Sequence, residues 1–169
     1  MMALRVMGGA AILGATWDLA RRAARPYEVR VRTLEEWQRF LRQLMPLIEW
    51  KRMALAGAVT EAGRGLTYLE PAMGRLGERL RDRDTELRGA WDHMLLSLPG
   101  LWGEDRPVLS ELGRVLGTSD ADHQHNHLEA AVREVDRLLD DARRARSRDG
   151  RMLPAMVGAI GMMVVILML

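Results

Sequence analysis

The chain has 169 residues, a length that fits one domain, or one small domain with membrane segments. Hydrophobic residues make up 48% and charged residues 28%, which excludes a disordered chain. Aromatic residues are scarce, and Ala, Leu, Met, Arg and Glu dominate, so we expect an all-α fold. The absence of cysteine excludes disulfides, cysteine metal ligands and thiol nucleophiles.

The net charge of +2 conceals an uneven distribution of charge along the chain. Residues 27–142 carry 16 basic and 21 acidic side chains, a net charge of −5, whereas the segments outside carry nine Arg against two Asp. A nucleic-acid-binding domain would carry its basic side chains on the folded body. The pI near 9.6 therefore does not indicate a nucleic acid as partner.

The N-terminal segment, residues 1–20, predicts a short transmembrane helix. Residues 6–17 carry no charge, and Arg21, Arg22 and Arg25 follow closely. A basic start and a short apolar core are also typical of a signal peptide, although the Arg-rich sequence that follows offers no clean cleavage site. A membrane span and a cleaved leader both stay open for this segment.

The C-terminal segment, residues 152–169, predicts a second transmembrane helix. It runs for 18 residues without a charge, close to the ~20 residues that cross a bilayer. The alternative is a buried C-terminal helix, although a helix of a soluble domain usually presents one polar face to water. Both arginine clusters border the middle segment, residues 21–151, so the positive-inside rule places that segment in the cytoplasm.

The middle segment predicts an antiparallel helical bundle. Its first helix is expected to begin where Thr33 and Glu36 have the spacing of a capping box. Pro46 should kink or end this helix near Leu44, because proline lacks the N–H that helix hydrogen bonds need. The helix carries an apolar seam with coiled-coil-like spacing. The seam consists of Leu34, Trp37, Leu41, Leu44 and Ile48.

Shorter helices separated by glycine- and proline-containing turns should follow. They run through Leu55 and Val59 to a break at 63–65, over 68–80, over 85–96 and over 108–116, with a turn at 98–100.

The last helix is expected over 120–148, with a second capping-box pattern at Ser119–Asp122. At 1.5 Å per residue its length is about 43 Å. One face is apolar, and the opposite face carries Arg, Glu and Asp. The apolar stripe consists of Leu128, Ala131, Val132, Val135, Leu138, Leu139, Ala142 and Ala145.

The densest polar cluster contains His123, His125 and His127. The first and last of these are four residues apart on a helix, a spacing that can bind one metal ion. The His-Glu-x-x-His pattern is absent, and a solvated helix start or a pH-sensitive surface accounts for the same residues. No phosphate-binding loop and no Gly-x-Ser-x-Gly motif is present. We therefore predict no enzymatic activity, no cofactor and no metal.

Several short motifs make the chain resemble the stage III sporulation protein AB family of endospore-forming bacteria. The resemblance covers nearly the whole length: an apolar start, a basic flank with Arg-Pro, a helical middle and an apolar end. More specific are an Ala-Trp pair and a Leu-Gly-x-x-Leu-Gly-x-x-Asp-x-x-x-Gln stretch that leads into the last helix. These motifs correspond to Arg25-Pro26, Ala90-Trp91, Leu112-Gly113, Leu116-Gly117, Asp120 and Gln124.

The chain departs from the family pattern after the first helix of the middle segment. It keeps Ile48, Trp50 and Leu55, but Leu47 stands where a Glu is expected and Ala54 where a Pro is expected. Any partner contact made by the missing Glu is therefore in doubt.

The resemblance implies a non-enzymatic membrane subunit of a channel complex that links mother cell and forespore. Its helical domain would resemble the cytoplasmic domain of type II secretion platform proteins. It would lie in the mother-cell cytoplasm, anchored in the outer forespore membrane. The expected partners are the cytoplasmic ATPase of the complex and its other membrane subunits.

Three residues are candidates for partner binding. Trp50 suits the core of the bundle and a partner contact equally well. Asp120 and Gln124 lie one helical turn apart and match the family pattern, so they serve either the helix start alone or a partner surface. An alternative function for the whole chain is a tail-anchored helical regulator that binds amphipathic partner helices in a groove.

Overall fold

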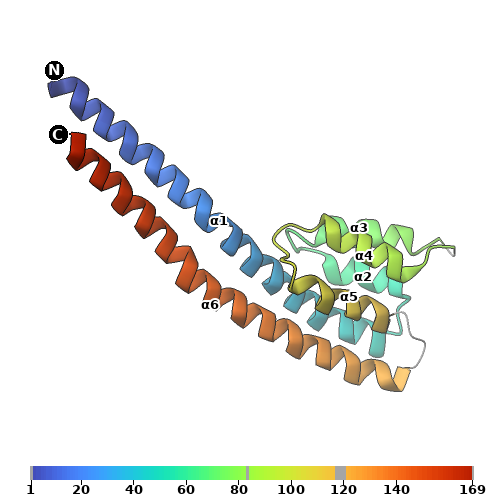
Figure 1. The fold of residues 1–169 in the computed structure, drawn as a ribbon. Helices are drawn as coiled ribbons and strands as arrows, with labels where there is room; N and C mark the ends of the chain where they lie inside the picture. Colours follow the sequence, from blue (N-terminus) through green and yellow to red (C-terminus); the bar gives the residue numbers. More distant parts are fainter. Residues whose placement is uncertain (1, 83, 117–120, 169) are drawn as a thin grey trace. The chain divides into compact units, whose positions relative to one another are not determined.

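The computed structural model describes residues 2–82, 84–116 and 121–168, and these residues form helices joined by turns (Figure 1). The predicted all-α fold is thus confirmed for the described residues. In chain order the helices are α1 (Met2–Glu49), α2 (Leu55–Gly63), α3 (Glu70–Arg79), α4 (Leu87–Ser97), α5 (Asp105–Leu116) and α6 (Ala121–Met168).

The chain divides into two compact units, which we call the helical domain and the terminal hairpin. The helical domain consists of residues 30–141, and the terminal hairpin combines residues 1–29 with residues 142–169. The long helices α1 and α6 therefore each contribute to both units. This division rests on compactness, so the membrane-span boundaries expected at residues 20 and 152 stay predictions.

The apolar seam of α1 forms the centre of the helical domain. The Trp37 ring meets the edge of Phe40 at a centroid distance of 5.4 Å and is tilted against Trp91 at 5.8 Å. Burying each large apolar side chain stabilises the fold by about 1.5–3 kcal/mol. The predicted seam is confirmed, because Leu34, Trp37, Leu41 and Leu44 are fully buried and Ile48 is half-buried.

The shorter helices stack in chain order within the domain: α2 packs on α3, α3 on α4, and α4 on α5 (Figure 1). The α4–α5 contact depends on Gly113, because a Cβ there would overlap the buried Trp91 ring. The Trp91 indole donates a hydrogen bond to the backbone oxygen of Leu109 at 2.8 Å. The short motifs Ala90-Trp91 and Leu112-Gly113 are therefore the two sides of one helix contact.

The predicted capping box at Thr33 and Glu36 is wrong, because α1 continues through both residues. Their side chains bond to other parts of the domain instead. The Thr33 hydroxyl donates to the Pro99 oxygen at 3.0 Å, and the Glu36 carboxylate accepts from the backbone N–H groups of Tyr68 and Leu69 at 2.8 and 3.1 Å. Glu36 thus accepts hydrogen bonds from two backbone N–H groups at the start of α3. N–H groups at a helix start have no acceptor within the helix itself.

The limits of the two long helices also differ from those expected. α1 passes Leu44 and ends at Glu49, so Pro46 lies within the last turn, where its missing N–H costs a single hydrogen bond. α6 does not stop near Arg148 but continues to Met168. Of the second capping box, Ser119 and Asp120 lie outside the described residues.

Residues of the predicted stripe on α6 mostly face inward. In the helical domain, Leu128, Val135, Leu138 and Leu139 are buried, whereas Ala131 and Val132 are half-buried; in the terminal hairpin, Ala142 is buried and Ala145 half-buried. The half-burial of Ala131 reflects a groove beside α6.

A buried ion pair fixes α5 against α1. Arg30 donates to both carboxylate oxygens of Asp105, at 3.0 and 2.7 Å, and to Glu104 at 2.6 Å. Its guanidinium also lies 4.4 Å from the centroid of the Trp102 ring. Burial alone would lower the pKa of Arg30, but the hydrogen bonds and charge of Asp105 and Glu104 raise it, so the side chain stays charged.

In the terminal hairpin the two ends of the chain run side by side (Figure 1). Arg146 faces Glu28 at 3.9 Å, and the helices approach closely where Gly161 meets Thr16. Within the part of the chain that the structure describes, no helix provides a stretch that is both long and apolar enough to cross a membrane.

Candidate functional site

The loop between α1 and α2 presents a large apolar side chain to solvent. Trp50 is 85% exposed, and Met53, three residues on, is 41% exposed. Backbone hydrogen bonds hold the loop: the N–H groups of Trp50 and Lys51 both donate to Pro46, and that of Met53 donates to Leu47. Arg52 adopts a left-handed conformation with φ 46°, which is uncommon for a residue other than glycine. The loop that carries the exposed indole is therefore held by backbone hydrogen bonds. The alternative that placed Trp50 in the core is wrong.

The antiparallel pairing of α1 with α6 defines what lies near this loop. Gln38 on α1 donates a hydrogen bond to Asp136 on α6. Trp50 lies twelve residues after Gln38, and Gln124 lies twelve residues before Asp136, so each is displaced by about 18 Å in the same direction. Figure 1 shows the end of α1 and the start of α6 at the same end of the helical domain.

We call this region, containing Trp50, Met53 and the first turns of α6, the distal end. It lies far from Arg30 and Asp141, where the chain leaves the helical domain. The backbone of Gln124 belongs to it, but the Gln124 side chain and all of Asp120 lie outside the described residues. Of the three candidate partner residues, the structure therefore places Trp50 fully, and Gln124 by its backbone alone.

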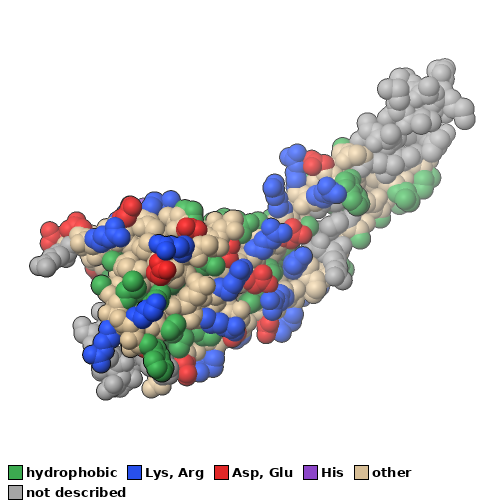
Figure 2. All heavy atoms as spheres, turned by 180° about the vertical axis from the view of Figure 1, so that it is seen from behind, with side chains coloured by type: hydrophobic (Ala, Val, Ile, Leu, Met, Phe, Trp, Pro, Cys, Tyr) green, Lys and Arg blue, Asp and Glu red, His purple; other side chains and the backbone are tan. Residues whose placement is uncertain are grey.

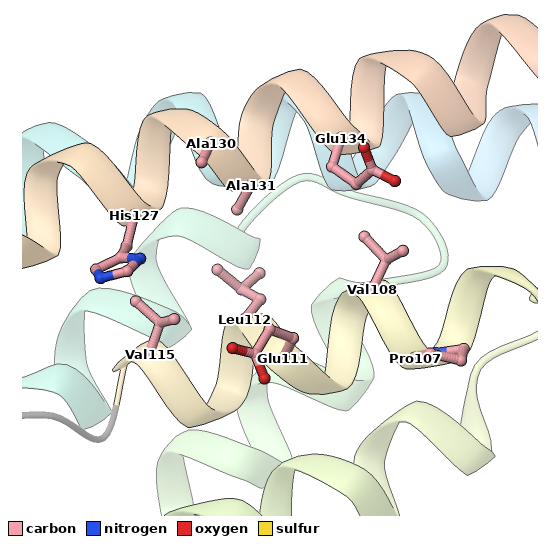
Figure 3. A pocket seen from close by; sticks show the side chains of 9 residues that line it. All are labelled: Pro107, Val108, Glu111, Leu112, Val115, His127, Ala130, Ala131 and Glu134. Carbon is pink, nitrogen blue, oxygen red and sulfur yellow. The ribbon is translucent and has the colours of Figure 1, made fainter.

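A second candidate surface is a groove between α5 and α6 with a volume of about 420 Å³ (Figure 3). Val108, Leu112 and Val115 rise from α5 toward the small side chains Ala130 and Ala131 of α6, which leave the space between the helices open. The groove is lined by Pro107, Val108, Glu111, Leu112, Val115, His127, Ala130, Ala131 and Glu134.

The charged residues of the groove are compensated by arginines on the same helices. Glu111 binds Arg114, with one contact at 2.8 Å, and Glu134 binds Arg137, with one contact at 3.0 Å. These hydrogen bonds lower the pKa of both carboxyl groups, so both remain ionised at neutral pH. The groove therefore offers an apolar floor between two rims of ion-paired side chains, a surface suited to an amphipathic helix.

Sequence reasoning did not identify this groove. The sequence feature that indicates the groove is the pair Ala130-Ala131, which places two small side chains beside the apolar face of α5. Periodicity alone classifies such alanines with the core, because it cannot show whether a larger side chain from another helix fills the space above them.

Among the described residues, no group of three His, Cys, Asp or Glu side chains could hold a metal ion. The side chains of His123 and His125 lie outside the described residues, and His127 lines the groove. The alternatives for the cluster therefore stay predictions.

Figure 2 shows basic and acidic side chains interleaved on the face it displays, so that the basic side chains do not gather in one patch there.

Comparison with known proteins identifies the family. The family described as stage III sporulation protein AB matches residues 5–169, nearly the whole chain, and the chain belongs to this family. No curated protein and no solved structure matches the chain. The expected likeness to the platform proteins of type II secretion therefore stays a prediction.

Proposed function

We propose that the protein is a non-enzymatic platform subunit of the membrane channel complex between mother cell and forespore. Its helical domain would dock the cytoplasmic ATPase of the complex and other membrane subunits. The terminal hairpin would hold it in the outer forespore membrane, with the helical domain in the mother-cell cytoplasm. Membership of the sporulation family supports this cellular context.

The exposed Trp50 is the observation that carries the docking proposal. A tryptophan combines a large, rigid apolar surface with an N–H donor, and such side chains are enriched at protein interfaces. Tryptophan is enriched among the few interface residues that dominate binding energy, and a braced loop lowers the entropy lost on binding. The distal end suits a partner that approaches from the cytoplasm, because it lies about 30 Å along α1 from Arg30, where the chain leaves the helical domain.

Membrane attachment is supported by the uncharged C-terminal stretch and by apolar side chains that the hairpin leaves exposed. The stretch extends to Leu169, which lies outside the described residues. Such side chains are expected to be covered by lipid or protein. The exposed apolar side chains on α6 are Met152, Met156, Ile160, Met162, Met163 and Ile166.

Replacing Trp50 by Ala tests the docking proposal. We expect Trp50→Ala to weaken binding of the cognate ATPase by about 30-fold or more, the usual effect of losing a dominant interface residue. The melting temperature of the full chain should not change, because the side chain is exposed. The control is Leu96→Ala, since Leu96 is an apolar residue of the same domain with 66% exposure. Equal binding by both variants and the wild type would refute the docking role of Trp50.

The double variant Asp120→Ala/Gln124→Ala tests the start of α6. A loss of ATPase binding at unchanged stability would place these residues in the interface. A fall in melting temperature that accounts for the whole loss would leave them a role at the helix start only.

Reporter fusions test the proposed topology. A reporter inserted near Gly100 should be cytoplasmic, whereas one fused after Leu169 should lie on the other side of the membrane. The opposite result would contradict the orientation inferred from the arginine clusters.

The groove between α5 and α6 favours the alternative, a tail-anchored regulator that binds an amphipathic helix. Ala131→Leu would place a larger side chain in the groove and should then abolish binding of the regulated partner. Mass spectrometry of the mature chain separates the two functions further, because a cleaved N-terminal segment would leave one anchor and favour the regulator.

A further inference from the structure

One face of α1 in the terminal hairpin carries an aromatic and two basic side chains in register. Trp17, Arg21 and Arg25 are spaced four residues apart, so they share one side of the helix. The Arg21 guanidinium carbon lies 5.3 Å from the centroid of the Trp17 ring, within the range of a cation–π contact. Trp17 is 64% exposed, so the pair faces outward. We call Trp17, Arg21 and Arg25 the α1 face.

The acidic residues near the α1 face are engaged by other arginines. Asp18 binds Arg22 at 2.7 Å. Glu28 faces Arg146 of α6 at 3.9 Å. Within the described part of the chain, neither Arg21 nor Arg25 has an ion-pair partner. The α1 face therefore carries two arginines that form no ion pair with any described residue of the hairpin.

These arginines border an open groove with a volume of about 580 Å³. It is lined by Asp18, Arg21, Arg22, Ala24, Arg25 and Glu28. Its position along the chain is the point where the uncharged N-terminal stretch gives way to charged residues. A groove that is lined by arginines and lies next to an uncharged stretch suits a ligand that combines an anionic group with an apolar part.

We propose that the α1 face binds an anionic phospholipid, with Arg21 and Arg25 on its phosphate and Trp17 beside the glycerol region. Guanidinium groups donate paired hydrogen bonds to phosphate, and tryptophan favours the boundary between headgroups and acyl chains. From Trp17 to Arg21 the helix rises about 6 Å, which matches a headgroup layer about 5–8 Å deep, and Arg25, one turn further, can reach the phosphate with its long side chain. This inference rests on the membrane attachment proposed above and goes beyond it by naming a lipid class.

Net charge separates anionic from zwitterionic lipids at this site. The phosphate of phosphatidylcholine is balanced by its own choline group, whereas phosphatidylglycerol carries an unbalanced negative charge. Each arginine near a membrane surface strengthens attraction to anionic lipid by about fivefold. Two unpaired arginines should therefore give a preference of about 5- to 25-fold at low ionic strength.

Quenching by brominated lipids tests the proposal in the full chain. The chain is reconstituted in vesicles of phosphatidylcholine and phosphatidylglycerol at a ratio of about 70:30, and either lipid carries the bromine. Trp17 is the only tryptophan of the terminal hairpin, so quenching that disappears in Trp17→Phe reports lipid beside the α1 face. With a preference of about 5- to 25-fold, phosphatidylglycerol should occupy about 70–90% of the lipid positions beside Trp17, against its share of about 30% of the bilayer, and its brominated form should account for that fraction of the quenching.

Two double variants separate the α1 face from a general effect of charge. Arg21→Gln/Arg25→Gln should reduce the lipid preference to about 1. The control Arg75→Gln/Arg79→Gln removes two exposed arginines with the same spacing from α3, and should keep the wild-type preference. About 0.5 M NaCl should weaken the preference, because salt screens exposed charges.

Three outcomes would overturn the inference. Equal quenching by the two lipids in the wild type would refute the anionic preference while leaving membrane attachment intact. Displacement of phosphatidylglycerol by millimolar inorganic phosphate would assign the site to a soluble anion instead. Absence of Trp17 quenching by either lipid, together with recovery of the chain outside the vesicles, would refute membrane attachment itself and with it the proposed function.

Discussion

Gly113→Ala should destabilise the helical domain although alanine favours helix formation. A Cβ at position 113 would overlap the Trp91 ring atoms Cδ1 and Cγ and would lie 2.9 Å from its Nε1. Trp91 is fully buried, and its N–H is committed to the Leu109 oxygen at 2.8 Å. The ring therefore cannot move aside without loss of a buried hydrogen bond, and otherwise α5 must shift away from α4.

The expected size follows from three opposing contributions. Overpacking a core costs about 1–3 kcal/mol, and leaving the buried indole N–H without an acceptor costs about 1–3 kcal/mol more. The higher helix propensity of alanine offsets about 1 kcal/mol. The net loss of unfolding free energy is about 1–5 kcal/mol. For a domain of this size the melting temperature should then fall by at least about 4 °C.

Thermal unfolding of the full chain measures this effect, with Gly74→Ala as the matched control. Gly74 also lies within a helix, but beyond the neighbouring backbone of that helix no described atom lies within 4 Å of the Cβ that alanine would add. Gly74→Ala should therefore keep or raise the melting temperature. If Gly113→Ala melts at or above the wild-type temperature, the close approach of α5 to Trp91 cannot be as tight as described.

Two further predictions concern contacts that α1 makes. Arg30→Met leaves Asp105 buried without its counter-charge and should lower the unfolding free energy in urea by about 3–5 kcal/mol, whereas the exposed neighbour variant Arg32→Met should change it by less than about 0.5 kcal/mol; equal effects would contradict the buried pair. Gly161→Leu should separate the hairpin helices, because even a Cβ there would lie 2.7 Å from the Thr16 hydroxyl oxygen. The distance between spin labels at positions 17 and 160, two exposed positions on the two helices, should then increase, and an unchanged distance would show that the helices do not meet at this glycine.

Periodicity predicted most of the helical domain, because a buried helix face leaves a regular apolar pattern. The α1 seam, α2, α4 and the turn at 98–100 all appear close to the expected residues. The limits of these helices depend on hydrogen bonds at their ends, which the pattern of apolar residues does not record.

The capping box predicted at Thr33 and Glu36 is wrong because the spacing of two residues does not reveal their hydrogen-bond partners in distant segments. Thr33 and Glu36 have side chains that can cap a helix, and their spacing alone suggested that they do. Both instead bond to segments more than 30 residues away, at Pro99 and at Tyr68 and Leu69. A polar side chain near the middle of a helix satisfies whichever backbone donor or acceptor the fold brings to it, and sequence spacing does not reveal that partner.

The same limitation applied to the functional residues. Trp37, Trp50 and Trp91 are the same type of residue, yet Trp37 and Trp91 are fully buried and Trp50 is 85% exposed. The apolar seam identified Trp37, but Trp50 follows the seam at the end of α1, where periodicity no longer defines a face. The buried Arg30–Asp105 pair was not predicted either, because 75 residues separate its members.

The motifs that carried the family resemblance acquire a physical meaning in the folded domain. Ala90-Trp91 and Leu112-Gly113 are more than 20 residues apart, yet Trp91 lies directly against Gly113. A large ring anchored through the Leu109 oxygen requires a facing position without a Cβ, so the tryptophan and the glycine depend on each other. This contact fixes α5 against α4, and the Arg30–Asp105 pair fixes α5 against α1. The apolar groove opens on the opposite side of α5, toward α6, so both contacts help to set its shape. The groove and the distal end therefore depend on these two helix contacts, and the Gly113 and Arg30 variants measure how much each contact stabilises the domain.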